Sequence, residues 1–389
     1  MKLSVLFPAA AFGLSFGLCQ TTLAETLLVG PGGNPSSLRQ AVAAAHDGDV
    51  IELLQGVYRG ETVVVPAKTL TLRGSGKGAV FDAEGKIAEG KALWVLRGGN
   101  ITVDNVEFRG ARADDANGAG IRLEAGHLKV QNCRFFDNEN GILTSNDIDA
   151  ELEIDASVFA DAPRVVGGLY HLLYVGRIGK FSVTGSRFQH GFEGHLLKSR
   201  ARESHINYNL IVDGPGGEAS YEVDLPNAGE VWMIGNVISQ SAGSQNPVVV
   251  AYGAEGGHWP RNTLYMAHNT LINHKTLPAW FLRLWRDKLP PDTDVYAVNN
   301  LSIGLGVFEW GASGHFSGNA HARQSVLVDA DTNGFELAAG GSLHGAGVDP
   351  THVGGQDLSP KAEFKMPVGT RPLPPLTRWS PGAFQGVSR

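Results

Sequence analysis

The stretch NLIV at residues 209–212 is one copy of a short pattern, an asparagine followed by apolar residues one and three positions later. Related segments begin at Asn105, Asn132, Asn236, Asn269 and Asn300, while Ala156 and Gly185 begin segments that keep the apolar frame without the asparagine. Successive segments start 24 to 33 residues apart. A repeat of this length is typical of a solenoid.

Each repeat also contains a second apolar strand, such as HLLYV at residues 171–175 and HLLKS at residues 195–199. Glycine and asparagine corners separate the strands without a helical period, which excludes leucine-rich and all-helical repeats. The sequence therefore predicts an all-β, single-domain, right-handed parallel β-helix with coils about 4.8 Å apart. We expect the recurring asparagine to point inward at a bend and bond the next coil, because buried amides need partners.

The two ends of the solenoid differ from its repeats. The alanine-rich segment at residues 35–49 predicts a helix with Ser36 or Ser37 as its N-cap, which would cover the open first coil. Its apolar face would consist of Leu38, Ala41, Val42 and Ala45. We expect the β-helix domain with this cap to span residues 25–348. The proline-rich residues 349–389 are expected to form an irregular tail packed on the solenoid.

Residues 1–24 have the pattern of a secretory signal, with Lys2, an apolar run and a small-residue ending at Ala24. Cleavage after Ala24 would leave Cys133 as the one cysteine, so no intramolecular disulfide is expected. No second apolar stretch is long enough to span a bilayer, so membrane insertion is not expected. The predicted location is secreted or periplasmic.

The charge balance argues against a nucleic-acid partner. Loss of Lys2 reduces 32 basic residues to 31, against 39 acidic residues, and no basic run or basic helix is present. We expect a monomer.

Stacking three consecutive second strands brings polar residues into two columns. Aligning HLLYV, HLLKS and YEVDL places His171, His195 and Tyr221 in one column, and Tyr174, Lys198 and Asp224 in the other. Unpaired charges are not accepted in a β-helix core, so these side chains should face outward on a groove. Five further residues are expected on the same face: His190, Glu193, Arg200, Arg202 and Glu222.

Such a face has the groups needed to cleave an anionic polysaccharide by β-elimination. Lys198 would take the C5 proton of a uronate, Arg200 would hold its carboxylate bidentately, and Tyr174 would protonate the departing oxygen. His171 and His195 would neutralise charge or exchange these roles. The predicted substrate-binding residues are His190, Arg202, Tyr221, Glu222 and Asp224.

Two resemblances support this interpretation. A capping helix followed by DGDVIELLQGVYRGE at residues 47–61 resembles the start of extracellular β-helix proteins of the pectin-lyase-like superfamily, which implies a carbohydrate-active protein. FEGHLLKSRARESHINYNLI at residues 192–211 is similar to the catalytic-lysine segment of the lyase family that contains chondroitinase B and alginate lyases. This second resemblance implies Lys198 as the base and, through Glu193, calcium as a ligand. No other metal or cofactor is expected.

The chain departs from that family at two places. Gly191 stands where the family has a second glutamate, and the surroundings of ASYEVDL, at residues 219–225, replace its catalytic arginine, so Arg200 would have to substitute. Two other functions stay open, a noncatalytic carbohydrate-binding or surface protein and a C5-epimerase of uronate polymers. The paired carboxylates of β-helix hydrolases are missing.

Overall fold

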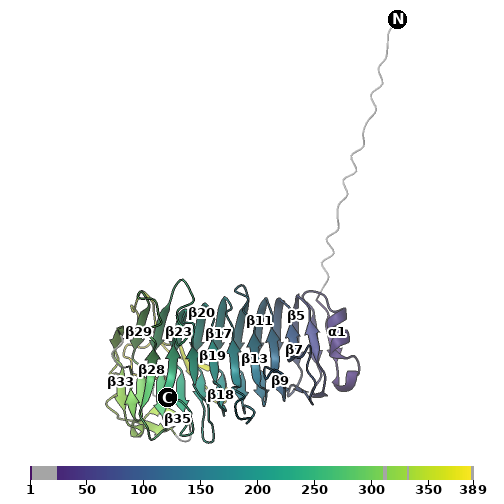
Figure 1. Cartoon of the computed structure of the whole chain (residues 1–389). Helices are drawn as coiled ribbons and strands as arrows, with labels where there is room; N and C mark the ends of the chain where they lie inside the picture. The colour runs from purple at the N-terminus through teal and green to yellow at the C-terminus, as the bar shows by residue number, and fades with distance from the viewer. Residues whose placement is uncertain (2–23, 310–312, 331–332, 387–389) are drawn as a thin grey trace.

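The computed structural model describes residues 1, 24–309, 313–330 and 333–386. The predicted signal segment lies outside these residues except at its two ends. The described chain winds into a solenoid with three long parallel sheets along its sides (Figure 1), which confirms the predicted all-β parallel β-helix. None of the described helices is long and apolar enough to cross a membrane.

Three sheets make up the solenoid; a complete coil contributes one strand to each, and the coils at the two ends are incomplete. The twelve-stranded sheet consists of β1 (Thr26–Val29), β2 (Val50–Leu53), β5 (Lys68–Gly74), β8 (Gly99–Asp104), β11 (His127–Gln131), β14 (Glu151–Asp155), β17 (Lys180–Thr184), β20 (Glu203–Asn207), β23 (Glu230–Ile234), β26 (Thr263–Ala267), β29 (Asp294–Val298) and β32 (His315–Ser317). The eleven-stranded sheet consists of β3 (Gly56–Arg59), β6 (Ala79–Asp82), β9 (Val106–Arg109), β12 (Arg134–Phe136), β15 (Val158–Ala160), β18 (Arg187–Gln189), β21 (Leu210–Val212), β24 (Val237–Gln240), β27 (Thr270–Asn273), β30 (Leu301–Ile303) and β33 (Ala320–Ala322). The ten-stranded sheet consists of β4 (Val63–Val65), β7 (Ala92–Leu96), β10 (Ala119–Leu123), β13 (Asn140–Thr144), β16 (His171–Val175), β19 (Leu197–Ser199), β22 (Val223–Leu225), β25 (Val248–Tyr252), β28 (Ala279–Leu284) and β31 (Gly306–Val307).

A ladder of buried asparagines joins successive coils just before the strands of the eleven-stranded sheet. The Asn236 side chain shows the pattern: its Oδ1 accepts from the backbone N–H of Asn209 at 3.0 Å, and its Nδ2 donates to the carbonyl of Ile206 at 2.7 Å. The same Nδ2 also donates to Oδ1 of Asn269 at 2.8 Å. The ladder comprises Asn209, Asn236, Asn269, Asn300 and Asn319. The prediction of an inward asparagine that bonds the next coil is therefore confirmed for this part of the repeat.

The predicted asparagine frame was wrong for the earlier coils, because Asn105 and Asn132 belong to the neighbouring column. They pair in register with Tyr208, and all three have a left-handed backbone, with φ of 56°, 52° and 56°. Their side chains bond outside the core, with Asn132 Nδ2 donating to Oδ1 of Asp104 at 2.9 Å. Asparagine suits both columns, since it tolerates a left-handed backbone and also makes amide bonds. The presence of an asparagine in the sequence therefore does not show to which of the two columns it belongs.

Aromatic rings fill much of the interior beneath the eleven-stranded sheet. Phe108, Phe135, Phe159 and Phe188 occupy one inward column, and their ring centroids stack 4.6 to 5.1 Å apart. All four side chains are buried. The parallel register places the four rings one coil spacing apart. Their stacking therefore adds contacts between coils without any change of coil geometry.

The first coil is covered by α1 (Leu38–Ala44), which follows the 3-10 turn η1 (Pro31–Gly33). Of the two predicted N-caps, Ser37 is the one that accepts from the backbone N–H of Gln40, whose side chain bonds back in a capping box. Leu38, Ala41 and Val42 are buried against the core, as the periodicity predicts.

The C-terminal residues run back along the corner between the twelve-stranded and eleven-stranded sheets. Past the 3-10 turn η2 (Gln324–Val326) they form two hairpins, β34 (Leu327–Asp329) with β35 (Gly334–Leu337) and β36 (Ala362–Phe364) with β37 (Thr370–Pro372). The backbone N–H of Gly369 bonds the carbonyl of Gly185 at 2.7 Å, and that of Lys361 bonds the Tyr208 hydroxyl at 2.9 Å. This segment therefore covers the left-handed corner.

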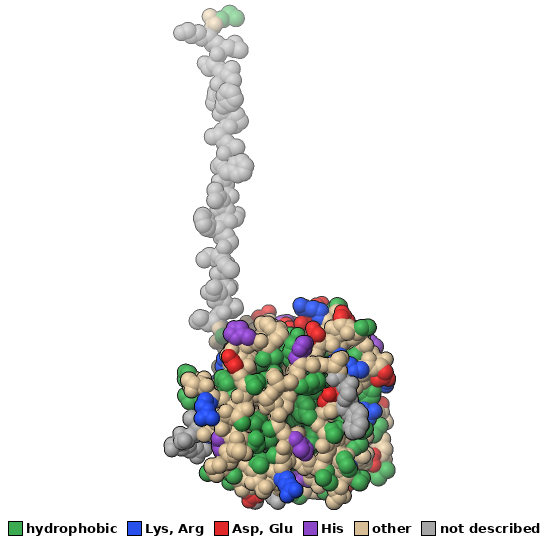
Figure 2. Space-filling view, turned by 90° about the vertical axis from the view of Figure 1, so that its left-hand side faces the viewer, with side chains coloured by type: hydrophobic (Ala, Val, Ile, Leu, Met, Phe, Trp, Pro, Cys, Tyr) green, Lys and Arg blue, Asp and Glu red, His purple; other side chains and the backbone are tan. Residues whose placement is uncertain are grey.

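Among the described residues, no α-helix covers the last coil as α1 covers the first. Figure 2 shows this end of the solenoid, where apolar side chains lie across the middle and charged ones are scattered around them. Leu305 and Phe316 are among the exposed apolar residues there.

We predict that Asn236→Ala lowers the free energy of unfolding by about 3 kcal/mol or more, because it leaves several buried backbone and amide groups without partners. Denaturant unfolding of the mature protein measures the effect. Asn100→Ala, at an exposed position of β8, should change stability little. Equal effects of the two substitutions would contradict the importance of the ladder.

Candidate active site

The three strands β16, β19 and β22 bring together the two polar columns that the sequence predicts. Tyr174 pairs with Lys198, and Lys198 pairs with Asp224. In the second column the rings of His171 and His195 lie 4.6 Å apart, and Tyr221 lies 5.0 Å beyond. The central cluster, defined as His171, Tyr174, His195, Lys198, Arg200 and Asp224, thus lies on the outer face of the ten-stranded sheet.

Gly194 explains how the histidines come so close. A side chain at this position would place its Cβ 1.6 Å from the carbonyl oxygen of Tyr170 in the preceding coil. Only glycine allows this approach of the two backbones. Directly after it, the backbone N–H of His195 donates to Nδ1 of His171 at 3.0 Å.

Tyr174 is held by Arg200, whose Nε donates to the tyrosine hydroxyl at 3.1 Å. The other guanidinium nitrogens bond Glu255, at 2.7 Å from Nη2 to Oε1 and also through Nη1, and Nη1 bonds Asn227 at 2.9 Å. These bonds use four of the five N–H groups of Arg200. Among the described residues, one N–H of Arg200 is left without a partner, so a bidentate bond to a substrate carboxylate would require Arg200 to release Asn227 or Glu255.

Lys198 and His195 share one carboxylate. Oδ2 of Asp224 lies 3.5 Å from Nζ of Lys198 and 3.2 Å from Nδ1 of His195. The side chains of Lys198 and Asp224 are only 11% and 5% exposed, so this ion pair is largely shielded from water. Lys198 Nζ also lies 5.5 Å from the centre of the Tyr174 ring, within range of a cation–π contact.

Both histidines of the central cluster are neutral near pH 7. Burial lowers the pKa of His171 well below its ordinary value, and the positive charges of Lys198 and Arg200 lower it further. Burial also lowers the pKa of His195, although Asp224 opposes this effect. Since Nδ1 of neutral His171 accepts the bond from His195, its proton is assigned to Nε2, which is left to donate.

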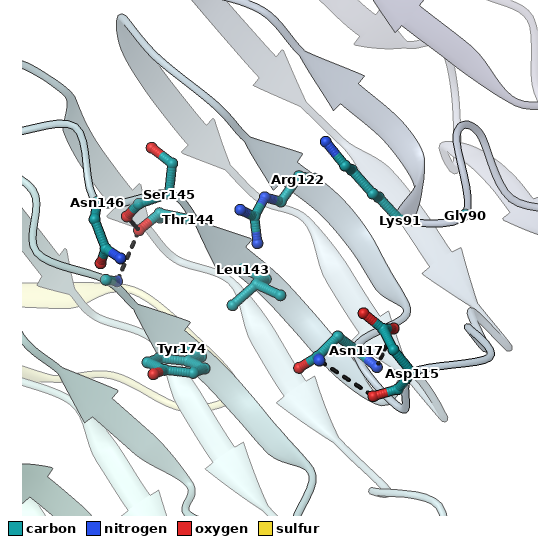
Figure 3. Close-up of a pocket in the computed structure, with 11 residues that line it drawn as sticks. Gly90, Lys91, Asp115, Asn117, Arg122, Leu143, Thr144, Ser145, Asn146 and Tyr174 are labelled. Carbon is teal, nitrogen blue, oxygen red and sulfur yellow. Dashed lines mark hydrogen bonds between the residues drawn. The ribbon is translucent and has the colours of Figure 1, made fainter.

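A pocket of about 340 Å³ adjoins Tyr174 on the side of the preceding coils (Figure 3). Its lining includes Lys91, Arg122 and Leu143, and Leu143 separates Arg122 from Tyr174 in the same outward column. Both cations lie close to Glu124, at 2.8 Å from Lys91 and 3.3 Å from Arg122. The pocket extends the central cluster along the solenoid axis.

Two predicted substrate-binding residues lie away from this face. His190 is hydrogen-bonded through Nδ1 to Oδ1 of Asp161 at 2.7 Å and lines a separate pocket of about 440 Å³ beside the eleven-stranded sheet. Arg202 is exposed at the turn toward β20, where its guanidinium lies near Gly179. Nearness in sequence was a poor guide for both residues, because each coil turns a corner within a few residues.

Glu222 was also predicted on the groove, and it lies inside the solenoid instead. It occupies the column of Leu196 and is fully buried, with Oε2 lacking a hydrogen-bond partner among the described residues. Burial, together with the nearby Asp213 carboxylate, raises the pKa of Glu222 well above its ordinary value. Aligning HLLKS with YEVDL indicates that Glu222 is buried, since it takes the place of Leu196, a core residue.

Glu193 accepts a hydrogen bond from the backbone N–H of Gly167 at 2.5 Å and stabilises the loop before β16. Within the described ranges, no group of three or more histidine, cysteine, aspartate or glutamate side chains is arranged to hold a metal ion. Calcium binding through Glu193 stays a prediction.

Two neighbours of the central cluster were not predicted from the sequence. Glu255, which engages Arg200, comes from the loop after β25, and no sequence pattern marks it. Arg122 was detectable, because aligning the strands of two further coils places it in the column of Tyr174.

Comparison with protein-family models finds no match, and comparison with curated proteins finds none either. Among solved structures, the chain is similar to the pectate lyase Pel9A, with a TM-score of 0.61 and 15% identity over 94% of this chain and 97% of that one. The PL6 family polysaccharide lyase Pedsa3628 from Pseudopedobacter saltans matches with a TM-score of 0.36 and 11% identity over 81% and 88% of the two chains. The likeness to Pel9A supports the parallel β-helix fold.

We predict that Glu222→Gln stabilises the protein more as pH rises. Because its pKa is raised in the folded state, native Glu222 keeps a proton that the unfolded chain loses above the ordinary value of 4.5, so stability falls with rising pH. The gain from the substitution should reach about 1–3 kcal/mol at pH 8 and be smaller at pH 4. Unfolding curves at both pH values measure it, with exposed Glu153→Gln as control; a gain independent of pH would contradict the assignment.

Proposed function

We propose that the chain is a polysaccharide lyase that cleaves a uronate-containing polymer by β-elimination, with Lys198 as the base and Tyr174 as the acid. The observation that carries the proposal is the meeting of Lys198, Tyr174 and Arg200 on one outward face beside a pocket. The fold shared with the pectate lyase Pel9A is compatible with it.

The reaction needs a proton acceptor near C5 of the sugar and a proton donor near the departing glycosidic oxygen. The unprotonated amine of Lys198 takes the C5 proton, the C–H electrons form a C4–C5 double bond, and the bond from C4 to the glycosidic oxygen breaks. The Tyr174 hydroxyl gives its proton to the departing oxygen. Lys198 and Tyr174 are neighbours in one column, so both reach the same face of a ring that lies along the sheet.

The positive charge around this column would stabilise the carboxylate as it gains negative charge. Arg200 contributes its remaining N–H, and neutral His171 contributes the proton on Nε2. Asp224 holds Lys198 beside Tyr174 rather than in solvent. Glu255 has the corresponding role for Arg200, since two bonds fix the plane of the guanidinium.

Binding without catalysis is the second candidate function. It is favoured by the pairing of Lys198 with Asp224 and of Arg200 with Glu255, because such pairs also occur on surfaces that only bind a ligand. An epimerase would need a proton donor on the opposite face of the ring from the base. Measurements of product release, polymer binding and inversion at C5 distinguish the lyase, the binding protein and the epimerase.

We predict that the mature protein releases unsaturated uronate products, and that Lys198→Ala slows this release by about 100-fold to 10,000-fold, because it removes the base. The ultraviolet absorbance of the unsaturated ring measures the rate on a panel of uronate polymers. Lys129→Ala, on the twelve-stranded sheet, is the matched control and should keep the full rate. No product from any polymer would rule out the lyase; binding alone would support the second candidate, and inversion at C5 without scission would indicate an epimerase.

For Tyr174→Phe we expect a fall in kcat of about 100-fold with KM nearly unchanged, because only the proton donor is lost while the ring stays in place. Steady-state rates on the polymer that the wild type cleaves provide the measurement. Tyr296→Phe, on β29, is the control. If Tyr174→Phe retained the wild-type kcat, the acid would have to be another group, such as His171.

A further inference from the structure

Arg283 belongs to the same outward column as Lys198, on β28. Lys198 pairs with Asp224, Asp224 pairs with Ala251, and Ala251 pairs with Arg283. Arg283 is therefore three strands from Lys198, which at the usual strand spacing is about 14 Å along the solenoid.

Two tryptophans hold the Arg283 guanidinium. Its Cζ lies 4.8 Å from the ring centre of Trp280 and 4.6 Å from that of Trp285. Contacts of this kind restrain the planar group through its faces and leave its N–H edge available for hydrogen bonds. Both tryptophans and Arg283 are partly exposed, so the edge is accessible from the outer face of the sheet.

Arg283 differs from the other cations of this face in having no acidic partner. Lys91 and Arg122 lie near Glu124, Lys198 near Asp224, and Arg200 near Glu255. Within the described part of the chain, no hydrogen bond or ion pair joins Arg283 to any residue. A guanidinium that is fixed in place and lacks an anion is suited to binding one from solution.

Two outward columns connect Arg283 with the central cluster. In one column, Asp224 and Ala251 lie between Lys198 and Arg283 and are both buried, and in the next column partly exposed Tyr221 lies beside His195. The charge of Arg283 acts on Tyr221, where it opposes the rise in pKa that burial causes. A linear ligand that passes over Lys198 along the sheet therefore reaches Arg283.

We propose that Arg283, with Trp280 and Trp285, is a distal subsite that binds an acid group of the polymer three sugar rings away from the ring at Lys198. This inference rests on the proposed function for the position of the reacting ring. A 1,4-linked pyranose advances along its chain by about the spacing of one coil, so the third ring meets the third strand.

This spacing favours one class of substrate. A polymer with a uronate in every ring presents a carboxylate at Arg283 whenever a uronate occupies the site at Lys198. In an unsulfated polymer that alternates uronate with a neutral amino sugar, the third ring carries no acid group. The geometry therefore selects homopolymeric uronates over alternating ones.

The test measures binding in a Lys198→Ala background, so that no ligand is consumed. Calorimetry with oligouronates of two to eight rings compares this protein with a second variant that also carries Arg283→Gln. We expect Arg283→Gln to weaken binding of the longest oligomers about tenfold and to leave di- and trisaccharides unaffected. Arg73→Gln, on the twelve-stranded sheet, is the matched control and should change neither.

Each result distinguishes the subsite from the reaction. Equal binding of long oligouronates with and without Arg283 would overturn the subsite, whatever the wild type cleaves. Arg283-dependent binding by a wild type that cleaves no polymer would support the subsite and overturn the lyase. If oligouronates of no length bound, both proposals would fail. Equal affinity for alternating and homopolymeric oligomers would overturn the substrate preference.

Discussion

The in-register stacking of coils is the constraint on which the rest of this molecule depends. Parallel strands about 4.8 Å apart turn each position of the repeat into a continuous column, so a residue is stabilised or destabilised by its equivalents in the coils on either side. The buried ladder from Asn209 to Asn319 uses this spacing, because each amide accepts from the preceding coil and, as far as Asn300, donates to the following one. A slip by one residue in these coils would break the ladder, and a slip in the earlier coils would turn a stacked phenylalanine outward.

The same stacking concentrates charge on the ten-stranded sheet. Lys198, Arg200 and two histidines lie in adjacent coils, an arrangement that would be repulsive if all four were protonated. Burial favours the neutral form of the histidines, while Asp224 lies beside Lys198 and Glu255 beside Arg200. The central cluster is thus compatible with folding and still presents an amine and a phenol side by side. Arg283 lacks such compensation, and its tryptophans restrain it without removing its charge.

Chain segments outside the repeat complete the solenoid. The helix α1 covers the first coil, and the C-terminal residues cover the corner where the backbone is left-handed. Loops between the coils supply groups that the strands lack, as Glu255 does for Arg200. Strands therefore determine the spacing of the candidate site, and loops complete its hydrogen bonds.

Local residue order was enough to predict the coil repeat, the helical cap and the two polar columns through His195 and Lys198, because apolar periodicity and strand alignment are properties of neighbouring residues. The direction in which individual side chains point became clear from the folded coils. Leu172 and Leu173 both face the core, which breaks simple alternation, and Glu222 follows them inward although its charge suggested the surface. His190 lies beside another sheet because the chain turns a corner after β18. Corners of unequal length and paired inward residues depend on the packing of neighbouring coils, and a single repeat does not contain that information.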